Sequence, residues 1–211
     1  MLHEALLNLA FFHNEIKPKH RENILSYLRI LYNRDEATFH HSIRVGLLAE
    51  SIALIAKCPG ITPKMLLWAG LLHDIGKILI HPDLLSKTKE FSDEDYEAMK
   101  VHPQHGWDML NKIHDYTAAI IVRHHTFGQN PYPCVLPPLP AYLIDREPLI
   151  TKAARLLALA DYYDALMNRQ NDKHGGQPQN AQEKQEKYIH DNQDQAELVE
   201  KLVSLGVLSF S

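Results

Sequence analysis

A histidine, an aspartate and a lysine stand close together inside an apolar run of the sequence, Leu71-Leu72-His73-Asp74-Ile75-Gly76-Lys77. Read as one helix, this run places His73 and Lys77 one turn apart, with Asp74 on the adjoining edge. Charged side chains among leucines need polar partners, because an unpaired buried charge is costly. The run therefore predicts the centre of a polar site, which we interpret as a metal-dependent phosphate site.

Other polar side chains fall on the apolar faces of predicted helices. His41 continues an apolar stripe in the helix expected over residues 38–57, and Asp161 continues another in the helix after residue 149. His102 precedes a proline, where one helix should end and the next begin, because the residue before a proline avoids the α conformation. The candidate ligands are His41, His73, Asp74, His102, His124, His125 and Asp161.

This set offers imidazole nitrogens and carboxylate oxygens, without a cysteine. Such ligands suit iron, manganese, zinc or nickel better than calcium or a structural zinc cage. Seven ligands are more than one tetrahedral ion uses, so two ions that share a carboxylate and a hydroxide fit the set better. The residues therefore predict a two-metal site.

Several of these residues also have an ordinary structural explanation. Taken alone, His41 would more often be a core or surface histidine, and a helix cap at His102 is compatible with metal binding. His124 and His125 are about 100° apart on a helix, so both reach one site only if the helix ends there. Asp164 either orients a ligand histidine or caps a helix. The ordered set favours ligation over these explanations.

Helices must carry these side chains, because apolar residues recur every three or four positions along most of the chain. The expected helices cover residues 2–16, 21–32, 38–57, 63–77, 92–102, 103–110 and 115–125, one segment after residue 149, and a last helix with Leu198, Leu202 and Leu205. Ser92, with Asp95 three residues later, should cap the helix that it begins, and Phe91 should pack on Tyr96. Nothing predicts a sheet or a repeat, so we expect an all-α fold.

Two segments lack this periodicity. Six of the twelve prolines lie within residues 126–149, which predicts a long surface loop over the site. Residues 170–180 are polar, which predicts a flexible segment. On the neighbouring helices, we expect Arg44 and Arg155 to be structural ion-pair or packing residues.

The composition excludes several classes of protein. With 211 residues and 45% hydrophobic content, the chain is long enough to bury one substantial core. A net charge of −4, from 22 basic and 26 acidic residues, gives no electrostatic basis for binding polymeric nucleic acid or an anionic membrane. Two cysteines, no cleavable leader pattern and no membrane-spanning apolar stretch predict a cytoplasmic protein.

The sequence also resembles a known family in several ordered segments. They are His41-Ser42-Ile43-Arg44-Val45, Leu71 to Ile78, Met99-Lys100-Val101-His102-Pro103 with Gly106, His124-His125, and Ala154-Arg155-Leu156-Leu157-Ala158-Leu159-Ala160-Asp161-Tyr162-Tyr163-Asp164-Ala165-Leu166. In this order they resemble the HD superfamily of metal-dependent phosphohydrolases, and most of all its HD-GYP branch, the bacterial cyclic di-GMP phosphodiesterases. The resemblance covers roughly residues 38–170.

The resemblance implies an organisation of the chain. We expect an HD-domain helical bundle in a single domain, with two short N-terminal helices and a C-terminal helix. The expected parts are an N-terminal helical extension packed on the core (1–36), the catalytic core (37–170), and a flexible segment with the C-terminal helix (171–211).

The resemblance also implies roles for individual residues. The seven candidate ligands would bind two divalent metal ions, iron or manganese first, with zinc, nickel and magnesium as alternatives. Asp74 would bridge the two ions, and Lys77 would lie beside the scissile phosphate. A hydroxide shared by the ions would attack phosphorus while the metals and Lys77 neutralise the developing charge. Arg169 and Lys173 lie near the family's basic phosphate-binding positions, so they are candidate substrate contacts.

The chain departs from the HD-GYP pattern in two places. After the double histidine, that branch has a glutamate and then an Asp-Gly-x-Gly-Tyr-Pro loop. Here the run is His124-His125-Thr126-Phe127-Gly128-Gln129-Asn130-Pro131-Tyr132-Pro133, in which only Tyr-Pro remains. Some members also have a glutamate four residues before the first histidine, which contributes to a third metal. Ala37 holds that position here, so we expect two metals.

Three functions from different classes remain in competition. The first is hydrolysis of a cyclic dinucleotide, above all cyclic di-GMP. The second is hydrolysis of another nucleotide or phosphate ester at the same metal site, which the altered loop favours. The third is a catalytically weak, nucleotide-binding signalling module, against which the intact ligand set argues. We expect a small-molecule nucleotide as the partner, together with a homo-oligomer or a signalling partner.

Overall fold

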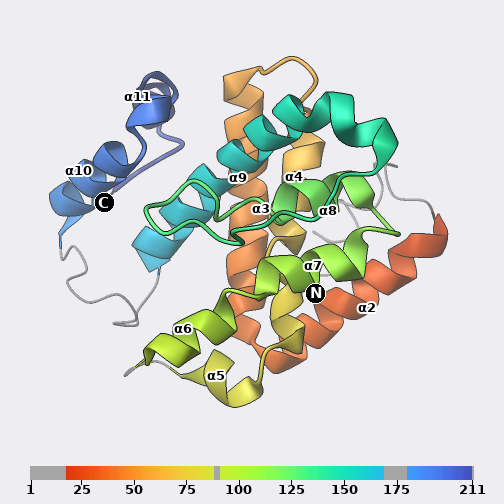
Figure 1. The fold of residues 1–211 in the computed structure, drawn as a ribbon. Helices are drawn as coiled ribbons and strands as arrows, with labels where there is room; N and C mark the ends of the chain where they lie inside the picture. The colour runs from red at the N-terminus through yellow and green to blue at the C-terminus, as the bar shows by residue number, and fades with distance from the viewer. Residues whose placement is uncertain (1–17, 88–90, 169–179, 211) are drawn as a thin grey trace.

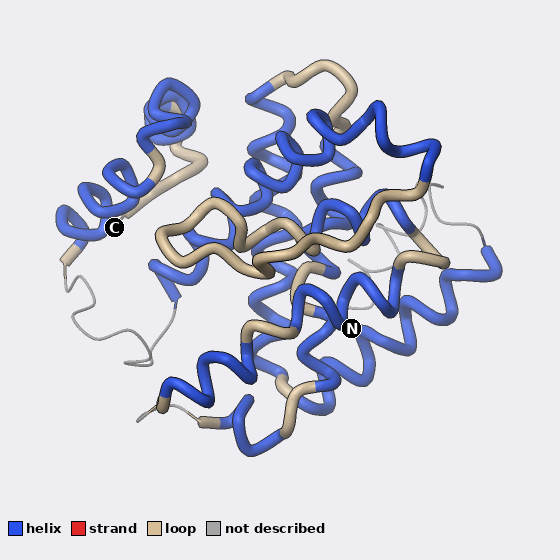
Figure 2. The backbone as a smooth tube through the Cα atoms, in the orientation of Figure 1, coloured by secondary structure: helices blue, strands red, loops and turns tan. Residues whose placement is uncertain are grey.

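In the computed structural model, residues 18–87, 91–168 and 180–210 are described, and they form helices joined by loops without a strand (Figures 1 and 2). The prediction of an all-α fold is confirmed. The α-helices are α2 (Pro18–Arg34), α3 (Glu36–Ala56), α4 (Pro63–Leu72), α5 (Pro82–Ser86), α6 (Asp93–Met99), α7 (His102–Leu110), α8 (Asp115–Ile121), α9 (Glu147–Asn168), α10 (Ala181–Asp191) and α11 (Ala196–Ser204). Short 3₁₀ helices cover Ile75–Leu79, Ala141–Arg146 and Gln193–Gln195.

Helix α3 is the central element, and α2, α4 and α9 pack around it (Figure 1). Its buried face includes Val45, Ala49 and Ile52, none of which is accessible to solvent. Helices α3 and α4 cross at two glycines: a Cβ added to Gly70 would lie 2.5 Å from the Cα of Gly46. This close approach brings the end of α4, where the first polar motif begins, against α3.

The polar motif at residues 73–77 does not continue α4, so the predicted helix over 63–77 is wrong in its last turn. Helix α4 ends at Leu72, two turn residues follow, and a 3₁₀ helix begins at Ile75. The reason lies at Gly76, where an added Cβ would lie 2.0 Å from the carbonyl oxygen of His102 and 2.6 Å from the amide nitrogen of Gly106. The tighter helix lets this backbone lie directly against α7.

The two helices that flank His102 match the prediction. Ser92 accepts a hydrogen bond from the Asp95 amide, and the Asp95 carboxylate accepts one from the Ser92 amide, which is a capping box. The rings of Phe91 and Tyr96 lie 5.4 Å apart between centroids, as the expected staple requires. Helix α6 then ends at Met99, and α7 begins at His102.

The helix before the double histidine is shorter than predicted, because α8 ends at Ile121 rather than at residue 125. Residues 122–127 form turns, so both histidines leave the helix axis. The loop that follows is also shorter than predicted, since a 3₁₀ helix occupies Ala141–Arg146 and α9 begins at Glu147. This loop passes across the body of the molecule (Figure 2).

The C-terminal part contains two helices where the sequence predicted one. Helices α10 and α11 follow one another on one side of the molecule (Figure 1), where α10 contacts α9 and α11 contacts α3. Val199 and Leu202 of α11 are buried, whereas Leu205 follows the helix and is 58% exposed, so its predicted place on the apolar stripe is wrong. The predicted helix over 2–16 lies outside the described residues, as does all but the last residue of the flexible segment predicted over 170–180.

Candidate metal centre

Four of the five candidate ligand histidines are held in one orientation by their Nδ1 atoms. In His73, His102 and His124, Nδ1 donates to the backbone carbonyl three residues earlier, at 2.5–2.8 Å. In His41, Nδ1 lies 2.7 Å from the Oδ2 atom of Asp164. A histidine whose Nδ1 carries the proton presents a lone pair at Nε2, which is the arrangement that metal-binding histidines use.

The Asp74 carboxylate lies between two groups of histidines. Its Oδ2 atom is 3.3 Å from Nε2 of His73 and 3.7 Å from Nε2 of His41. Its Oδ1 atom is 3.2 Å from Nε2 of His102. One carboxylate oxygen therefore faces each group, as a carboxylate that bridges two ions requires.

Asp161 completes the group on the Oδ2 side of Asp74. Its Oδ1 atom lies 3.1 Å from Nε2 of His41 and 3.6 Å from Nε2 of His73. On the other side, single ligand atoms of His102, His124 and His125 all lie within 4.8 Å of one another. The structure thus brings all seven candidate ligands together, from α3, the turn after α4, α7, the turns after α8, and α9.

Two buried nitrogen atoms test whether a metal fits here. Nε2 of His41 and Nε2 of His73 are buried and make no hydrogen bond. A buried polar atom without a partner costs free energy, and most such atoms in native proteins are satisfied. Both nitrogens face the carboxylates of Asp74 and Asp161. A divalent ion placed among these four side chains would satisfy the nitrogens and neutralise the carboxylates, so the residues fit a metal.

Burial favours the neutral form of three of the candidate ligand histidines. Removal from water lowers the pKa of His102 to about 3 and that of His124 to about 4, and it lowers the pKa of His125 well below its usual value. At neutral pH these three imidazoles therefore carry a lone pair. Neutral imidazole is the form that binds metal ions.

The carboxylates are ionised despite their burial. Burial by itself raises the pKa of Asp74, but the nearby His73 and Lys77 lower it well below its usual value. Burial likewise opposes ionisation of Asp161, and His41 and His73 overcome it. Burial also opposes the charge on His73, yet Asp74 and Asp161 raise its pKa to about 10. A divalent ion bound between these carboxylates would balance their buried negative charge.

Lys77 lies at the edge of this cluster. Its Nζ atom is 2.7 Å from Oδ2 of Asp74, three residues earlier along the 3₁₀ turn. The ammonium group also lines the groove described below. A cation in this position adjoins both the ligand carboxylate and the space where a phosphate would lie.

Asp164 orients His41, which decides between the two explanations that the sequence left open. Its Oδ2 atom contacts Nδ1 of His41, while Arg44 donates to both carboxylate oxygens at 2.7 and 2.9 Å. Asn168 donates a further bond to Oδ1 at 2.9 Å. The expected structural ion pair of Arg44 is therefore confirmed, and its partner is the residue that holds a candidate ligand.

Tyr132 is a neighbour of the site for which the sequence predicted no role. Its ring stacks on the imidazole of His125, with centroids 4.4 Å apart and planes at 30°. Its amide donates to the His125 carbonyl at 3.3 Å. This bond holds the loop beside His125. The surviving Tyr-Pro pair was the signal that could have identified it. The two predicted substrate contacts, Arg169 and Lys173, lie outside the described residues.

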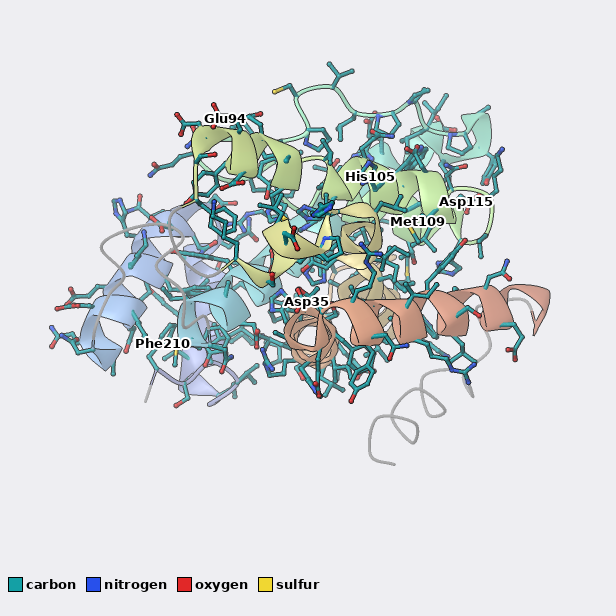
Figure 3. All side chains as sticks on the ribbon, turned by 90° about the horizontal axis from the view of Figure 1, so that it is seen from below. Asp35, Glu94, His105, Met109, Asp115 and Phe210 are labelled. Atoms are coloured by element: carbon teal, nitrogen blue, oxygen red, sulfur yellow. The ribbon has the colours of Figure 1, made fainter. Side chains whose placement is uncertain are left out.

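A groove of about 1310 Å³ opens onto the candidate ligands. His41, His102, His125 and Lys77 line its inner part, and residues of α5 and α6 line its outer part. Figure 3 shows Asp35, at the start of α3, and Glu94, on α6, separated by the yellow segment that contains the 3₁₀ turn and α5. Residues of α3, α5, α6, α7 and α9 all line the groove.

The sequence is also similar to that of known proteins. The sequence profile of the HD domain family matches residues 38–166. Cyclic di-GMP phosphodiesterase PA4108 of Pseudomonas aeruginosa is 30% identical over 161 aligned residues, covering 74% of this chain and 36% of that protein. The cyclic di-GMP phosphodiesterase response regulator RpfG of Xanthomonas campestris is 30% identical over 164 residues, covering 74% of this chain and 40% of that protein. This chain thus spans well under half the length of either relative.

The fold also resembles that of solved structures. The HD domain of the phosphodiesterase PgpH of L. monocytogenes superimposes with a TM-score of 0.55 at 16% identity, covering 80% of this chain and 83% of that domain. A complex of that domain with cyclic-di-AMP gives a TM-score of 0.53 at 18% identity, with 81% and 82% covered. Among the described residues, no helix has the length and apolar character needed to cross a membrane.

Proposed function

Since the chain belongs to the HD domain family, we propose that it is a metal-dependent phosphodiesterase that hydrolyses a cyclic dinucleotide, and that its substrate is cyclic di-GMP. One observation carries the proposal: seven histidine and aspartate side chains, all buried or partly buried, converge, and Oδ2 of Asp74 faces His73 while Oδ1 faces His102. Two ions in such a site, with iron or manganese as our first choice, supply Lewis acidity toward a phosphate and a water of lowered pKa.

The side chains of this chain have distinct roles in the proposed reaction. The Nδ1 bonds of the histidines fix their rings before substrate arrives, so little reorganisation is needed at the moment of reaction. Lys77 places a positive charge at the inner end of the groove, beside Asp74. There it neutralises the charge that develops on the phosphate oxygens as phosphorus is attacked. Burial of the ligands excludes bulk water and strengthens these interactions.

The choice of substrate rests on the relatives and on the groove. The two relatives above, and others from Vibrio cholerae and Thermotoga maritima at 28% and 31% identity, are named cyclic di-GMP phosphodiesterases. A groove of 1310 Å³ is ample for a dinucleotide. The same proposal takes residues 37–170 as the catalytic core, Arg169 and Lys173 as further phosphate contacts, and a bacterial cytoplasmic signalling pathway as the setting. A regulatory partner or a second copy of the chain would deliver the signal.

A second candidate has one observation in its favour. The loop after His125 lacks the glutamate and the Asp-Gly pair of the HD-GYP pattern, although Tyr132 still covers His125. A changed loop beside an unchanged ligand set favours a different nucleotide at the same metal site. A Vibrio cholerae relative at 25% identity is named as a phosphodiesterase specific for 3'3'-cGAMP, so the relatives differ in the substrates for which they are named.

The experiment that tests the proposal compares substrates on one preparation. Purified protein is loaded with Mn²⁺ or Fe²⁺, and the hydrolysis of cyclic di-GMP, 3'3'-cGAMP, cyclic di-AMP and the mononucleotide GMP is followed by chromatography. We expect cyclic di-GMP to be opened fastest, and chelation of the metal to stop the reaction. Preference for another cyclic dinucleotide or for a mononucleotide would support the second candidate, and no metal-dependent turnover of any substrate would contradict both.

A further inference from the structure

The groove extends well beyond the candidate metal ligands, toward an outer wall made by α5 and α6. This wall includes Lys87, Phe91, Tyr96 and Lys100, all of which line the same groove as His102 and Lys77. A metal-bound phosphate occupies only the inner end. The outer wall is therefore available to whatever part of a substrate extends away from the scissile bond.

Two aromatic rings stand side by side on this wall. Phe91 and Tyr96 lie 5.4 Å apart between centroids, with their planes inclined at 49°, and both are only partly buried. The pair staples the start of α6, yet it also presents aromatic surface to the groove. The Nζ atom of Lys87 lies 5.8 Å from the Phe91 centroid, on the same wall. Aromatic surface next to lysines is what single-stranded nucleic-acid sites offer to bases and phosphates.

The wall is fixed relative to the metal centre. The carbonyl oxygen of Met99, at the end of α6, accepts the Nδ1 hydrogen bond of the candidate ligand His102 at 2.7 Å. The start of α6 is secured by the capping box at Ser92, and Lys87 pairs with the Asp95 carboxylate at 2.5 Å. A substrate bound to the metal ions would therefore meet the wall at a set distance.

The outer cation best suited to a phosphate is Lys100. It pairs with Glu97 at 2.5 Å, three residues away on the surface of α6, and the Glu97 side chain is 70% exposed. Exposed pairs of this kind contribute little to stability. An arriving phosphate can thus replace Glu97 at small cost, with Lys100 two residues from the ligand His102.

We infer that Phe91, Tyr96 and Lys100 form a subsite for the half of a cyclic dinucleotide that is not being cleaved. A base of that half stacks on the aromatic pair, and the second phosphate pairs with Lys100. The inference rests on the proposed function, and it names the part of the chain that distinguishes a dinucleotide from a small phosphate diester. It adds a specificity role for α6 to the metal chemistry of α3, α7 and α9.

The test compares two substrates on the metal-loaded protein: cyclic di-GMP, and methyl p-nitrophenyl phosphate, which is too small to span the groove. Tyr96→Leu keeps an apolar partner for Phe91 but removes the aromatic face, and Lys100→Ala removes the charge. We expect each substitution to raise the KM for cyclic di-GMP roughly 5- to 100-fold. The ratio of kcat/KM values, dinucleotide over small diester, should fall accordingly. Lys112→Ala, an exposed lysine outside the groove lining, is the matched control and should leave this ratio unchanged.

Direct binding separates failure of the subsite from failure of the proposed function. Affinity for fluorescently labelled cyclic di-GMP is measured for each variant, with metal content and thermal unfolding as checks on folding. Weaker binding in Tyr96→Leu and Lys100→Ala, at unchanged metal content, supports the subsite even if the protein turns over neither substrate. Unchanged binding in both folded variants overturns the subsite, while metal-dependent turnover of the small diester would still uphold the hydrolase.

Discussion

Asp74 is the residue at which the two groups of candidate ligands meet. Its Oδ2 atom faces His73 and His41, and its Oδ1 atom faces His102. A monodentate side chain in its place could serve only one group. The neighbouring Lys77 contacts this carboxylate, but as a cation it cannot bind a metal ion. Loss of Asp74 and loss of Lys77 should therefore have different consequences.

We predict that Asp74→Ala abolishes phosphodiesterase activity and lowers the metal content of the purified protein. Lys77→Ala should keep the metal and lose activity, by roughly 100-fold or more, since a charge beside the reacting phosphate is removed. Metal content is measured by mass spectrometry of the protein after gel filtration, and activity on the same fractions. Equal loss of metal in both variants would contradict these roles.

Asp164 is expected to act through His41 rather than on the substrate. In Asp164→Asn the charged partner of His41 Nδ1 and of Arg44 is lost, while the side-chain volume is kept. Loss of such an orienting group typically costs about 10- to 100-fold in metal affinity or activity. We predict that excess Mn²⁺ partly restores the activity of this variant.

Asn168→Ala is the matched control for Asp164→Asn, because it removes only the outer hydrogen bond to Asp164. It should have a much smaller effect at any Mn²⁺ concentration. If excess metal leaves Asp164→Asn as inactive as before, the orienting role is wrong and the residue has a different function.

At this scale the sequence predicted which residues converge, because hydrophobic periodicity and the family pattern both identify inward-facing side chains. It could not predict which carboxylate oxygen faces which histidine, because that depends on how the helices pack. Nor could it predict that Asp164 pairs with His41 and Arg44, because these contacts join positions more than 100 residues apart. Tyr132 is a similar case. Its stacking on His125 follows from the path of the loop, which no periodicity describes.

At the scale of elements, the break between α4 and the 3₁₀ turn is what shapes the site. The turn lets Gly76 lie against the backbone of α7, so that Asp74 and His102 face each other. The α-helix that periodicity predicted through residue 77 does not explain this contact. Periodicity cannot detect such a break, because leucines and isoleucines continue on both sides of it.

We predict that Gly76→Ala is strongly destabilising. Its Cβ would lie 2.0 Å and 2.6 Å from backbone atoms of α7, which cannot move as a side chain can. Overpacking of this kind costs about 1–3 kcal/mol or more, so thermal unfolding should shift down by roughly 2–4 °C per kcal/mol. Gly128→Ala is the control, since nothing lies within 4 Å of the added atom. A Gly76→Ala protein as stable as the wild type would show that the contact with α7 is wrong.

The C-terminal segment, residues 180–210, is tied to α9 by an ion pair that should respond to acid. The guanidinium of Arg155 donates to Asp194 at 2.6 and 2.9 Å and lowers the pKa of that carboxyl to about 2. A carboxyl whose pKa is lower in the folded state stabilises the fold above its ordinary pKa, and this contribution is lost as pH falls toward 2. Because Asp194 is largely exposed, the effect is screened and modest.

We therefore predict that Asp194→Asn lowers the thermal unfolding temperature by a few degrees at pH 7. The difference from the wild type should narrow as pH falls from 4 toward 2, where the native carboxyl also becomes neutral. Unfolding followed by circular dichroism across this range measures it, with the exposed Asp83→Asn as a control. A difference in unfolding temperature that stays constant with pH would show that the Arg155–Asp194 pair does not stabilise the fold.

The C-terminal segment also shows where sequence patterns fail at this scale. Helix α10 (Ala181–Asp191) was not predicted, because Tyr188 is its one buried residue and no apolar stripe marks it. Its order comes from tertiary contacts: the Tyr188 hydroxyl donates to the Leu159 carbonyl, and the ring stacks near Tyr162. By contrast, α3 and α6 were predicted well, because a long apolar stripe defines the former and a capping box the latter.

At the scale of the whole molecule, substrate attraction must be local. The net charge is −4, and the cations that line the groove each have a carboxylate neighbour: Arg44 with Asp164, Lys77 with Asp74, Lys87 with Asp95, and Lys100 with Glu97. Divalent ions would neutralise Asp74 and Asp161 and so make the net charge at the inner end of the groove more positive. Metal loading is thus expected to prepare the molecule for an anionic ligand as well as for catalysis.

Metal loading should also couple to folding, because the ligands come from segments between residues 41 and 161 that meet only in the folded chain. An ion that binds the folded state alone stabilises it by about 4 kcal/mol at a concentration one thousand times its dissociation constant. The family pattern in the sequence indicated which residues are the ligands. The coupling of metal binding to folding follows from how the fold brings them together.

The most direct test of the central claim is a titration of metal-free protein with Mn²⁺, in which bound metal, thermal unfolding and hydrolysis of cyclic di-GMP are measured on the same samples. We predict that activity appears with the metal and reaches its maximum near two ions per chain, while the unfolding temperature rises in step. A chain that binds no divalent metal, or that hydrolyses the dinucleotide equally well in the presence of a chelator, would contradict the two-metal centre.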